Sequence, residues 1–221
     1  MVCKMKLIFL ILVFFVFVNL DCHKSKCAHP YLFDIPYHHS LLNDTISVGD
    51  TIWVTADFGP QLIDNSSGEV CTFNNINFQS NLIFGEISGT KPRYINEKFT
   101  LINIIGSATL NYFSTDTIYT LGKGGSYDII YEGKLNYKLK LGFVAQEKGL
   151  YSANYTSRFL NRKIEKVDTK CDGEIYIQGA MNDKDTASNN FHLTSYSNNN
   201  FYKTISVNEF QNEGMFCFVV K

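Results

Sequence analysis

The 221-residue chain lacks a surplus of charge of either sign. Its 20 Lys and Arg residues against 21 Asp and Glu residues give a formal net charge of −1. A protein that binds nucleic acid needs a basic surface to neutralise phosphates, so this composition argues against nucleic acid as a partner. No run of acidic residues is present either, which excludes a solvated acidic tail.

Motifs that carry chemistry are also missing. No two cysteines have the C-x-x-C spacing of a zinc or redox site, and no G-x-S-x-G nucleophile elbow occurs. Gly122–Gly125 lacks the spacing and the Lys-Ser/Thr ending of a phosphate-binding loop, so we expect only a turn there. His38 and His39 are adjacent, and adjacent side chains of a strand point to opposite faces. The sequence therefore predicts no catalytic centre, no metal site and no cofactor.

Alanine, the best helix former, is scarce, whereas aromatic residues are abundant. The chain has 18 Phe, 13 Tyr and a single Trp. These side chains bury large areas and argue against disorder. Together with the many Ile, Thr and Asn residues, they favour strands joined by polar turns.

The N-terminus has the features of an export signal. Lys4 and Lys6 precede the apolar run Leu7–Val18. A membrane-spanning helix needs about 20 apolar residues, and this run is shorter. We therefore predict that residues 1–21 are an export signal peptide and that the mature protein is extracytoplasmic, either secreted or attached to the cell envelope.

The end of this signal leaves two alternatives open. Val18–Cys22 resembles a bacterial lipoprotein signal, in which Cys22 would carry the lipid, but Asp21 stands where a small residue is expected. In the first alternative, Cys22 is the lipid attachment site and the anchor is the protein's only contact with the membrane. In the second, cleavage is ordinary and Cys22 remains a thiol or a disulfide partner.

Four further cysteines follow Cys22 in the predicted mature chain. An odd total of five is consistent with one cysteine being occupied otherwise, for example by lipid. The other four would then form two disulfides, in any of three pairings. These disulfide candidates are Cys27, Cys71, Cys171 and Cys217.

The rest of the chain is predicted to consist of a tether followed by a β-rich body. Residues 22–36 contain Pro30 and Pro36 without hydrophobic periodicity, so they are predicted to be a tether. Residues 37–221 are predicted to form one elaborated β-sandwich domain. Two small β domains that divide near residue 165 are the alternative, and the absence of a Pro- or Gly-rich linker favours one domain.

The clearest strand signal lies in the middle of the chain. Residues 134–144 alternate apolar and polar side chains, and Glu132-Gly133 before them predicts a hairpin with 127–131. Trp53 falls on the polar face of another alternating stretch, so we expect it to be partly buried. Val207 and Phe210 indicate one or two helical turns over 206–213. Two alternating stretches within 45–54, separated by a turn at Gly49-Asp50, are also predicted strands. The other predicted strands are 70–78, 81–87, 99–105, 108–113, 117–121, 150–156, 174–178 and 215–220.

A short motif narrows the predicted fold class. Glu147–Tyr151 places Gly149 and Tyr151 directly before a strand, as in the tyrosine corner of immunoglobulin-like sandwiches. A simple glycine turn is the alternative. We therefore predict an all-β, antiparallel, immunoglobulin-like β-sandwich with insertions and one short helix near the C-terminus.

Several segments together resemble a group of uncharacterised exported bacterial proteins. The resemblance implies a β-rich fold and a location in the cell envelope, and it implies no activity. The segments are Ile35–Tyr37, Val48–Val54, Glu147–Tyr151 and Gly214–Val220.

The expected function is non-enzymatic binding or scaffolding, with a protein or glycan at the cell surface as the partner. A hydrolase of surface polysaccharide is one alternative, and it would need two close carboxylates. A small-ligand carrier is another, and it would need an apolar interior cavity.

Overall fold

The computed structural model describes residues 28–73, 76–88, 93–94, 98–114, 123–156, 167–169, 173–181, 189–212 and 214–221. The predicted export signal, the cysteines Cys22, Cys27 and Cys171, and the predicted strand 117–121 lie outside these residues. Within the described part of the chain, no helix is long and apolar enough to cross a membrane.

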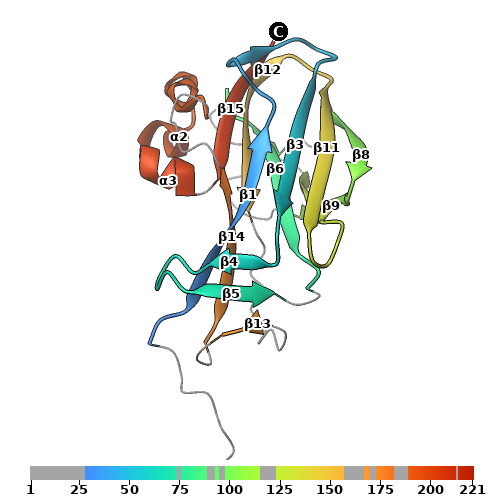
Figure 1. Cartoon of the computed structure of the whole chain (residues 1–221). Coiled ribbons are helices and arrows are strands. Elements are labelled where there is room, and N and C mark those ends of the chain that lie inside the picture. The colour runs from blue at the N-terminus through green and yellow to red at the C-terminus, as the bar shows by residue number, and fades with distance from the viewer. Residues whose placement is uncertain are drawn as a thin grey trace, which may run out of the picture.

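Two β-sheets stack face to face, which confirms the predicted all-β sandwich (Figure 1). Most neighbouring strands are antiparallel, but β1–β14 and β2–β15 are parallel pairs at the sheet edges. The five-stranded sheet has the order β14 (Ile175–Met181), β1 (Tyr31–His39), β3 (Thr51–Phe58), β11 (Tyr137–Ala145) and β8 (Phe99–Ile105). The seven-stranded sheet has the order β2 (Thr45–Ile46), β15 (Met215–Val220), β12 (Gly149–Thr156), β6 (Gln79–Glu86), β10 (Lys123–Ile130) and β9 (Ser107–Ser114), with β7 (Arg93–Tyr94) also on β6.

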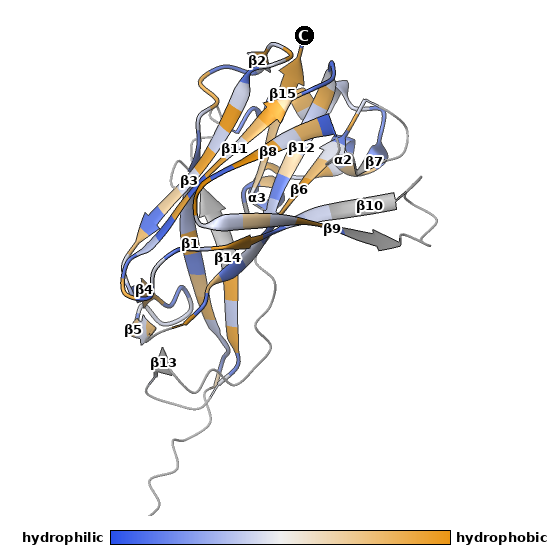
Figure 2. Ribbon diagram, turned by 90° about the vertical axis from the view of Figure 1, so that its right-hand side faces the viewer, coloured by the Kyte–Doolittle hydropathy of each residue, from blue (hydrophilic) through white to orange (hydrophobic). Residues whose placement is uncertain are grey.

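Alternation along strands such as β1, β3 and β11 builds the core between the sheets. In β11, Tyr137, Leu139, Leu141 and Phe143 are fully buried, while the residues between them face outward or lie against Trp53. Figure 2 shows the same alternation as changing colours along the strands. The predicted alternation is therefore that of a half-buried strand from Tyr137 onward, whereas Leu135 precedes the strand and is exposed.

The alternation does not, however, form the predicted hairpin. β10 pairs with β6 and β9 in one sheet, whereas β11 pairs with β3 and β8 in the other. Only one bridge, Glu132–Lys138, connects the two sides of the turn. The chain crosses between sheets at Gly133, so the hairpin prediction is wrong. The glycine turn predicted over Gly122–Gly125 is also misplaced in part, because Lys123 begins β10.

The N-terminal boundary of the body also differs from the expectation. Residues 31–36, assigned from sequence to a tether, are the first part of β1. Tyr31, Phe33 and Ile35 are buried there, and the strand runs parallel to β14 from Tyr31 to Tyr37. Pro36 is accommodated because β1 pairs with β3 only at His38 and His39, so no ladder bond to β3 is lost.

Three short helices cover one end of the outer face of the seven-stranded sheet. They are η2 (Phe191–Tyr196), α2 (Asn200–Thr204) and α3 (Val207–Asn212). The predicted helix is α3, and Ser206 and Glu209 start it with reciprocal side-chain-to-backbone hydrogen bonds of 3.2 and 3.1 Å. η2 and α2 have no counterpart among the elements predicted from the sequence. Because these helices cover β15, that strand is apolar on both faces.

The two described cysteines are buried in different places. Cys71 lies in the core between the sheets, and Cys217 lies beneath the helices in a separate apolar cluster. Cys217 is a free thiol, and burial raises its pKa well above the ordinary value. No disulfide joins two residues of the described part of the chain. A Cys71–Cys217 bond is therefore not among the predicted disulfides that can form.

A small third sheet lies against β1, and the buried Asp64 carboxylate joins the two together with a backbone bridge between Phe33 and Asp64. This sheet has the order β13 (Val167–Asp168), β5 (Val70–Phe73) and β4 (Gln61–Ile63). Asp64 accepts hydrogen bonds from the amides of Leu32, Ser66 and Ser67 at 2.7, 3.2 and 3.0 Å, and from the Ser67 hydroxyl at 2.6 Å. Burial alone would raise the pKa of Asp64, but these hydrogen bonds together hold it below its ordinary value.

Replacing this carboxylate should loosen the small sheet from β1. We expect Asp64→Ala to lower the free energy of unfolding by about 2–3 kcal/mol, because it leaves buried donors without an acceptor. Since the folded pKa is lowered, the stabilisation should be complete above about pH 4 and be lost as pH falls through the folded value. Urea unfolding of both variants measures this, with the exposed Asp57→Ala as control. Equal effects of the two substitutions would contradict the role of Asp64.

Candidate functional site

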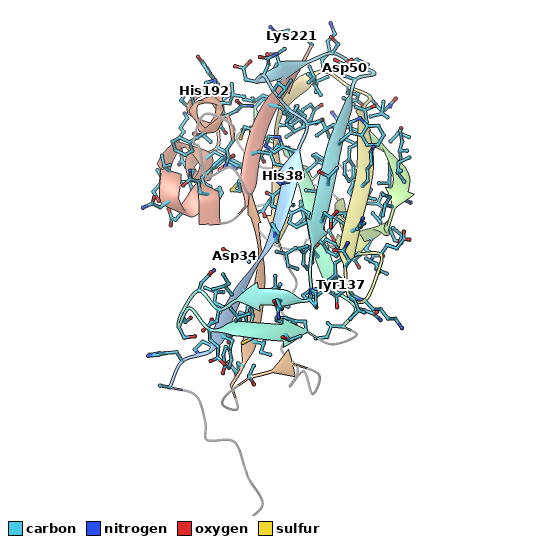
Figure 3. All side chains as sticks on the ribbon, in the orientation of Figure 1. Asp34, His38, Asp50, Tyr137, His192 and Lys221 are labelled. Atoms are coloured by element: carbon cyan, nitrogen blue, oxygen red, sulfur yellow. The ribbon has the colours of Figure 1, made fainter. Side chains whose placement is uncertain are left out.

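No described element covers the outward side of the central strands β3 and β11, whereas β4 and β5 cross in front of the lower part of β1 and β14 (Figure 1). Alternation puts Ile52, Val54 and Ala56 of β3 into the core, so the residues between them must face outward. Figure 3 shows Asp34 and His38 on β1, which borders this surface. We call the central part of this surface the Trp53 face; it consists of Thr51, Trp53, Thr55, Asp57, Ile102, Lys138, Lys140, Gly142 and Val144.

Trp53 lies across the backbone of a glycine in the neighbouring strand. The register of β3 and β11 places Trp53 directly opposite Gly142. A Cβ atom at Gly142 would be 2.9 Å from Cζ3 of the Trp53 ring and 3.0 Å from Cγ2 of Thr51. A glycine inside a strand weakens the strand, and it often marks a place where another group approaches closely. Here the approaching group is the indole ring, which remains half-buried, as the sequence predicted.

A lysine completes the surroundings of the ring. The ammonium nitrogen of Lys140 lies 5.3 Å from the centroid of the Trp53 ring, within the range of a cation–π contact. The indole N–H of Trp53 has no acceptor among the described residues. The face therefore presents an aromatic surface, a ring donor and a cation side by side.

The charges on the face are unevenly compensated. Lys138 lies 3.6 Å from the carboxylate of Asp57, which stands opposite it on β3. Lys140 has no carboxylate within ion-pair distance in the part of the chain that the structure describes. The two lysines are two residues apart on the same strand and the same side, yet only one of them has a carboxylate partner.

Sequence reasoning found only part of this arrangement. It placed Trp53 on the polar side of its strand, and it placed Lys138, Lys140 and Gly142 on the polar side of theirs. What it missed is that these two polar sides are one surface, because the β3–β11 register connects residues nearly ninety positions apart. Local sequence offers no direct signal for such a register.

A second constellation bears on the hydrolase alternative. The Lys98 ammonium lies 2.7 Å from Glu147 Oε2 and 3.8 Å from Glu86 Oε2, so two carboxylates meet at one cation. Glycoside cleavage requires one carboxyl group to hold a proton at working pH. In this cluster one ammonium contacts both carboxylates. The arrangement therefore has the chemistry of an ion-pair cluster.

The predicted corner residues lie next to this cluster. The Tyr151 hydroxyl donates to the carbonyl oxygens of Glu147 and Lys148 at 3.0 and 3.2 Å, which is the type of contact that a tyrosine corner makes. Burial, with the nearby Glu86 and Glu147 charges, raises the pKa of Tyr151 to about 12. A Cβ at Gly149 would be 2.8 Å from the phenol oxygen, so the glycine makes room for the ring.

The histidine pair has no shared site. His39 packs on the Phe216 ring with centroids 4.4 Å apart, whereas His38 is exposed on β1. Within the described ranges, no group of three or more His, Cys, Asp or Glu residues is arranged to hold a metal ion.

The interior bears on the carrier alternative. Three buried tyrosines and one serine connect the two sheets there. Tyr37 donates to the Gly214 carbonyl at 2.5 Å and stacks on Tyr155 with ring centroids 4.1 Å apart. The Ser80 hydroxyl donates to Tyr155 at 2.8 Å, and the Tyr131 and Tyr155 hydroxyls are in contact. Phenol groups that bond to each other thus fill this part of the interior.

These tyrosines should make the fold sensitive to alkali. Burial raises the pKa of Tyr131 to about 12, and burial together with the Tyr131 charge raises that of Tyr37 and Tyr155. Above about pH 10 the unfolded chain loses protons that the folded chain keeps, so stability should fall by about 1.4 kcal/mol per pH unit for each such tyrosine.

Urea unfolding at increasing pH, together with tyrosinate absorbance of the folded protein, measures this effect. Tyr155→Phe should show a shallower fall, because one titrating group is removed. If all 13 tyrosines of the folded protein ionise near their ordinary pKa, the raised pKa values of Tyr37, Tyr131 and Tyr155 are refuted.

The fit between Trp53 and Gly142 can be tested by fluorescence, because Trp53 is the only tryptophan. We expect Gly142→Ala to push the ring into water, with red-shifted emission and stronger quenching by acrylamide, since the new Cβ would overlap the ring. Gly59→Ala is the matched control, because a Cβ there would meet nothing within 4 Å. Identical spectra for the two variants would rule out the packing described.

Comparison with known proteins gives little further constraint. No protein-family model and no curated protein matches the sequence. Among solved structures, the second type II cohesin module of the ScaA scaffoldin of Acetivibrio cellulolyticus is similar at 10% identity and a TM-score of 0.28, over 70% of this chain and 96% of that one. A non-cellulosomal cohesin from Archaeoglobus fulgidus is similar at 10% identity and a TM-score of 0.21, over 69% and 88%. Similarity this low carries no argument about function, so the site has to be interpreted from its own residues.

Proposed function

We propose that this chain is a non-enzymatic binding protein that holds a protein partner on the Trp53 face. The observation that carries this proposal is the half-buried single tryptophan, laid over Gly142 on two central strands whose outward side no described element covers. Tryptophan is among the residues most often responsible for binding energy at protein interfaces, particularly near their centre. Trp53 has such a central position, because β3 and β11 have neighbours on both sides.

The composition of the face favours a protein over a glycan. Ile102 and Val144 add apolar area beside the ring, and Asp57 and Lys138 form a charged pair at one end. An apolar centre with a charged rim is the usual anatomy of a protein interface. A sugar would need the open side of the indole ring for stacking, and Lys140 lies over the ring.

Catalysis and small-molecule transport have less support from the side-chain geometry. The close carboxylates Glu86 and Glu147 both contact the Lys98 ammonium, which is the arrangement of an ion-pair cluster. The Tyr37, Tyr131 and Tyr155 side chains occupy the sandwich interior, where a carrier would hold its ligand. Surface binding is therefore the function best supported.

The proposal includes an extracytoplasmic location. It rests on the predicted signal peptide over 1–21, with Cys22 either lipid-bearing or free after cleavage. A lipid on Cys22 would fix the protein to the envelope and make its role a surface scaffold, whereas a soluble product would act on secreted partners.

Site-specific photo-crosslinking in the producing cell tests the proposal. A photo-crosslinking amino acid at Thr55, on the Trp53 face, should give a discrete protein adduct. Trp53→Ala in the same background should reduce the adduct at least about tenfold, as expected for an interface hot spot.

The same crosslinker at Thr109 is the positional control, because Thr109 is exposed on β9 of the opposite sheet. The folded state of each variant is checked by its unfolding transition. An adduct that forms equally at both positions, or that is unchanged by Trp53→Ala, would overturn the proposal.

A further inference from the structure

We infer that the partner of the Trp53 face presents a carboxylate that docks on Lys140. This inference rests on the proposed function and specifies the chemistry of the partner. It starts from the difference between the two lysines of β11, which share one strand, one side and one sheet face. Their surroundings differ in two respects: Lys138 has a carboxylate partner, whereas Lys140 lies near the Trp53 ring.

Lys138 already has its counter-charge. The Asp57 carboxylate stands opposite it in the register and lies 3.6 Å from its ammonium. A partner that paired with Lys138 would have to break this contact and leave Asp57 unpaired. Lys138 therefore has little to gain from an acidic partner.

Lys140 has a weaker contact and no carboxylate. Its cross-strand neighbour is Thr55, and its ammonium lies 5.3 Å from the Trp53 ring centroid. At a water-exposed surface such a cation–π contact is weak. When a partner covers the face, water is removed from the ammonium, and a buried cation without a counter-charge is costly. A carboxylate supplied by the partner removes that cost.

The neighbouring groups agree with an acidic partner. His38 lies opposite Thr55 on β1 and therefore in the same row as Lys140, with no acidic residue between them. The nearest acid on β1 in the outward direction is Asp34, about 13 Å along the strand from His38. The indole N–H of Trp53, which has no acceptor among the described residues, could donate to the same carboxylate or to the backbone beside it. The chemistry that fits is thus an acidic side chain next to an apolar one.

The Thr55 crosslinking assay tests this inference with matched variants. Lys140→Gln should lower the adduct yield about tenfold, because it removes an interfacial ion pair. Lys140→Arg should keep most of the wild-type adduct yield, because it keeps the positive charge. Lys138→Gln should change the adduct yield less than about twofold. Addition of roughly 0.5 M salt should weaken the wild-type adduct and leave the remaining Lys140→Gln adduct nearly unchanged.

The outcomes separate the inference from the function on which it rests. If Trp53→Ala abolishes the adduct but Lys140→Gln does not, the face binds a protein and the acidic contact is refuted. Equal losses for Lys138→Gln and Lys140→Gln would also refute it, because a general loss of positive charge would then suffice. An adduct that resists protease and carries sugar would overturn it in favour of an acidic glycan. Loss of all dependence on Trp53 would overturn the proposed function itself.

Discussion

The packing of aromatic rings between the two sheets is the interaction on which the rest of the structure depends. Phe84 stacks on Phe99 with centroids 4.2 Å apart, and Phe143 and Tyr127 meet beside them at 5.1 Å. A strand that slipped by one residue would turn its rings into water, so the rings fix the registers of the strands that carry them. Because the registers are fixed, the composition of the outer face follows from the same alternation.

How much of the fold the sequence predicts depends on whether the signal is local. The strand pattern of β11 and the turn before Tyr151 are contained in short stretches, and both were recognised. The pairing of β11 is not local, since alternation shows which side of a strand is buried but not which strand lies beside it. β1 was missed for a different reason: Pro30 and Pro36 suggested a tether and hid the alternation of Tyr31, Phe33 and Ile35.

The candidate site was predictable only in its parts. Trp53 was expected to be half-buried, and the alternation of β11 already placed Lys140 and Gly142 on one side. Their meeting depends on the β3–β11 register, and the space for the ring depends on the missing Cβ of Gly142. The contrast between Lys138 and Lys140 likewise appears only when the position of Asp57 is known.

The two outer faces of the sandwich show what kind of contact the Trp53 face is suited to make. On the seven-stranded sheet, Met215 and Cys217 face outward and are permanently covered by the chain's own helices. That covered surface is mostly apolar, and Ser152, which lies beside Cys217, is hydrogen-bonded there to the Tyr202 hydroxyl. The Trp53 face instead mixes one aromatic ring with threonines, lysines and a carboxylate. Its side chains also stand on two central strands held by the core, so little ordering is needed on binding. These properties suit the reversible binding of a protein partner, as proposed above. The face is polar enough to contact water when it is free, and a partner with a complementary charge would match it when it is bound.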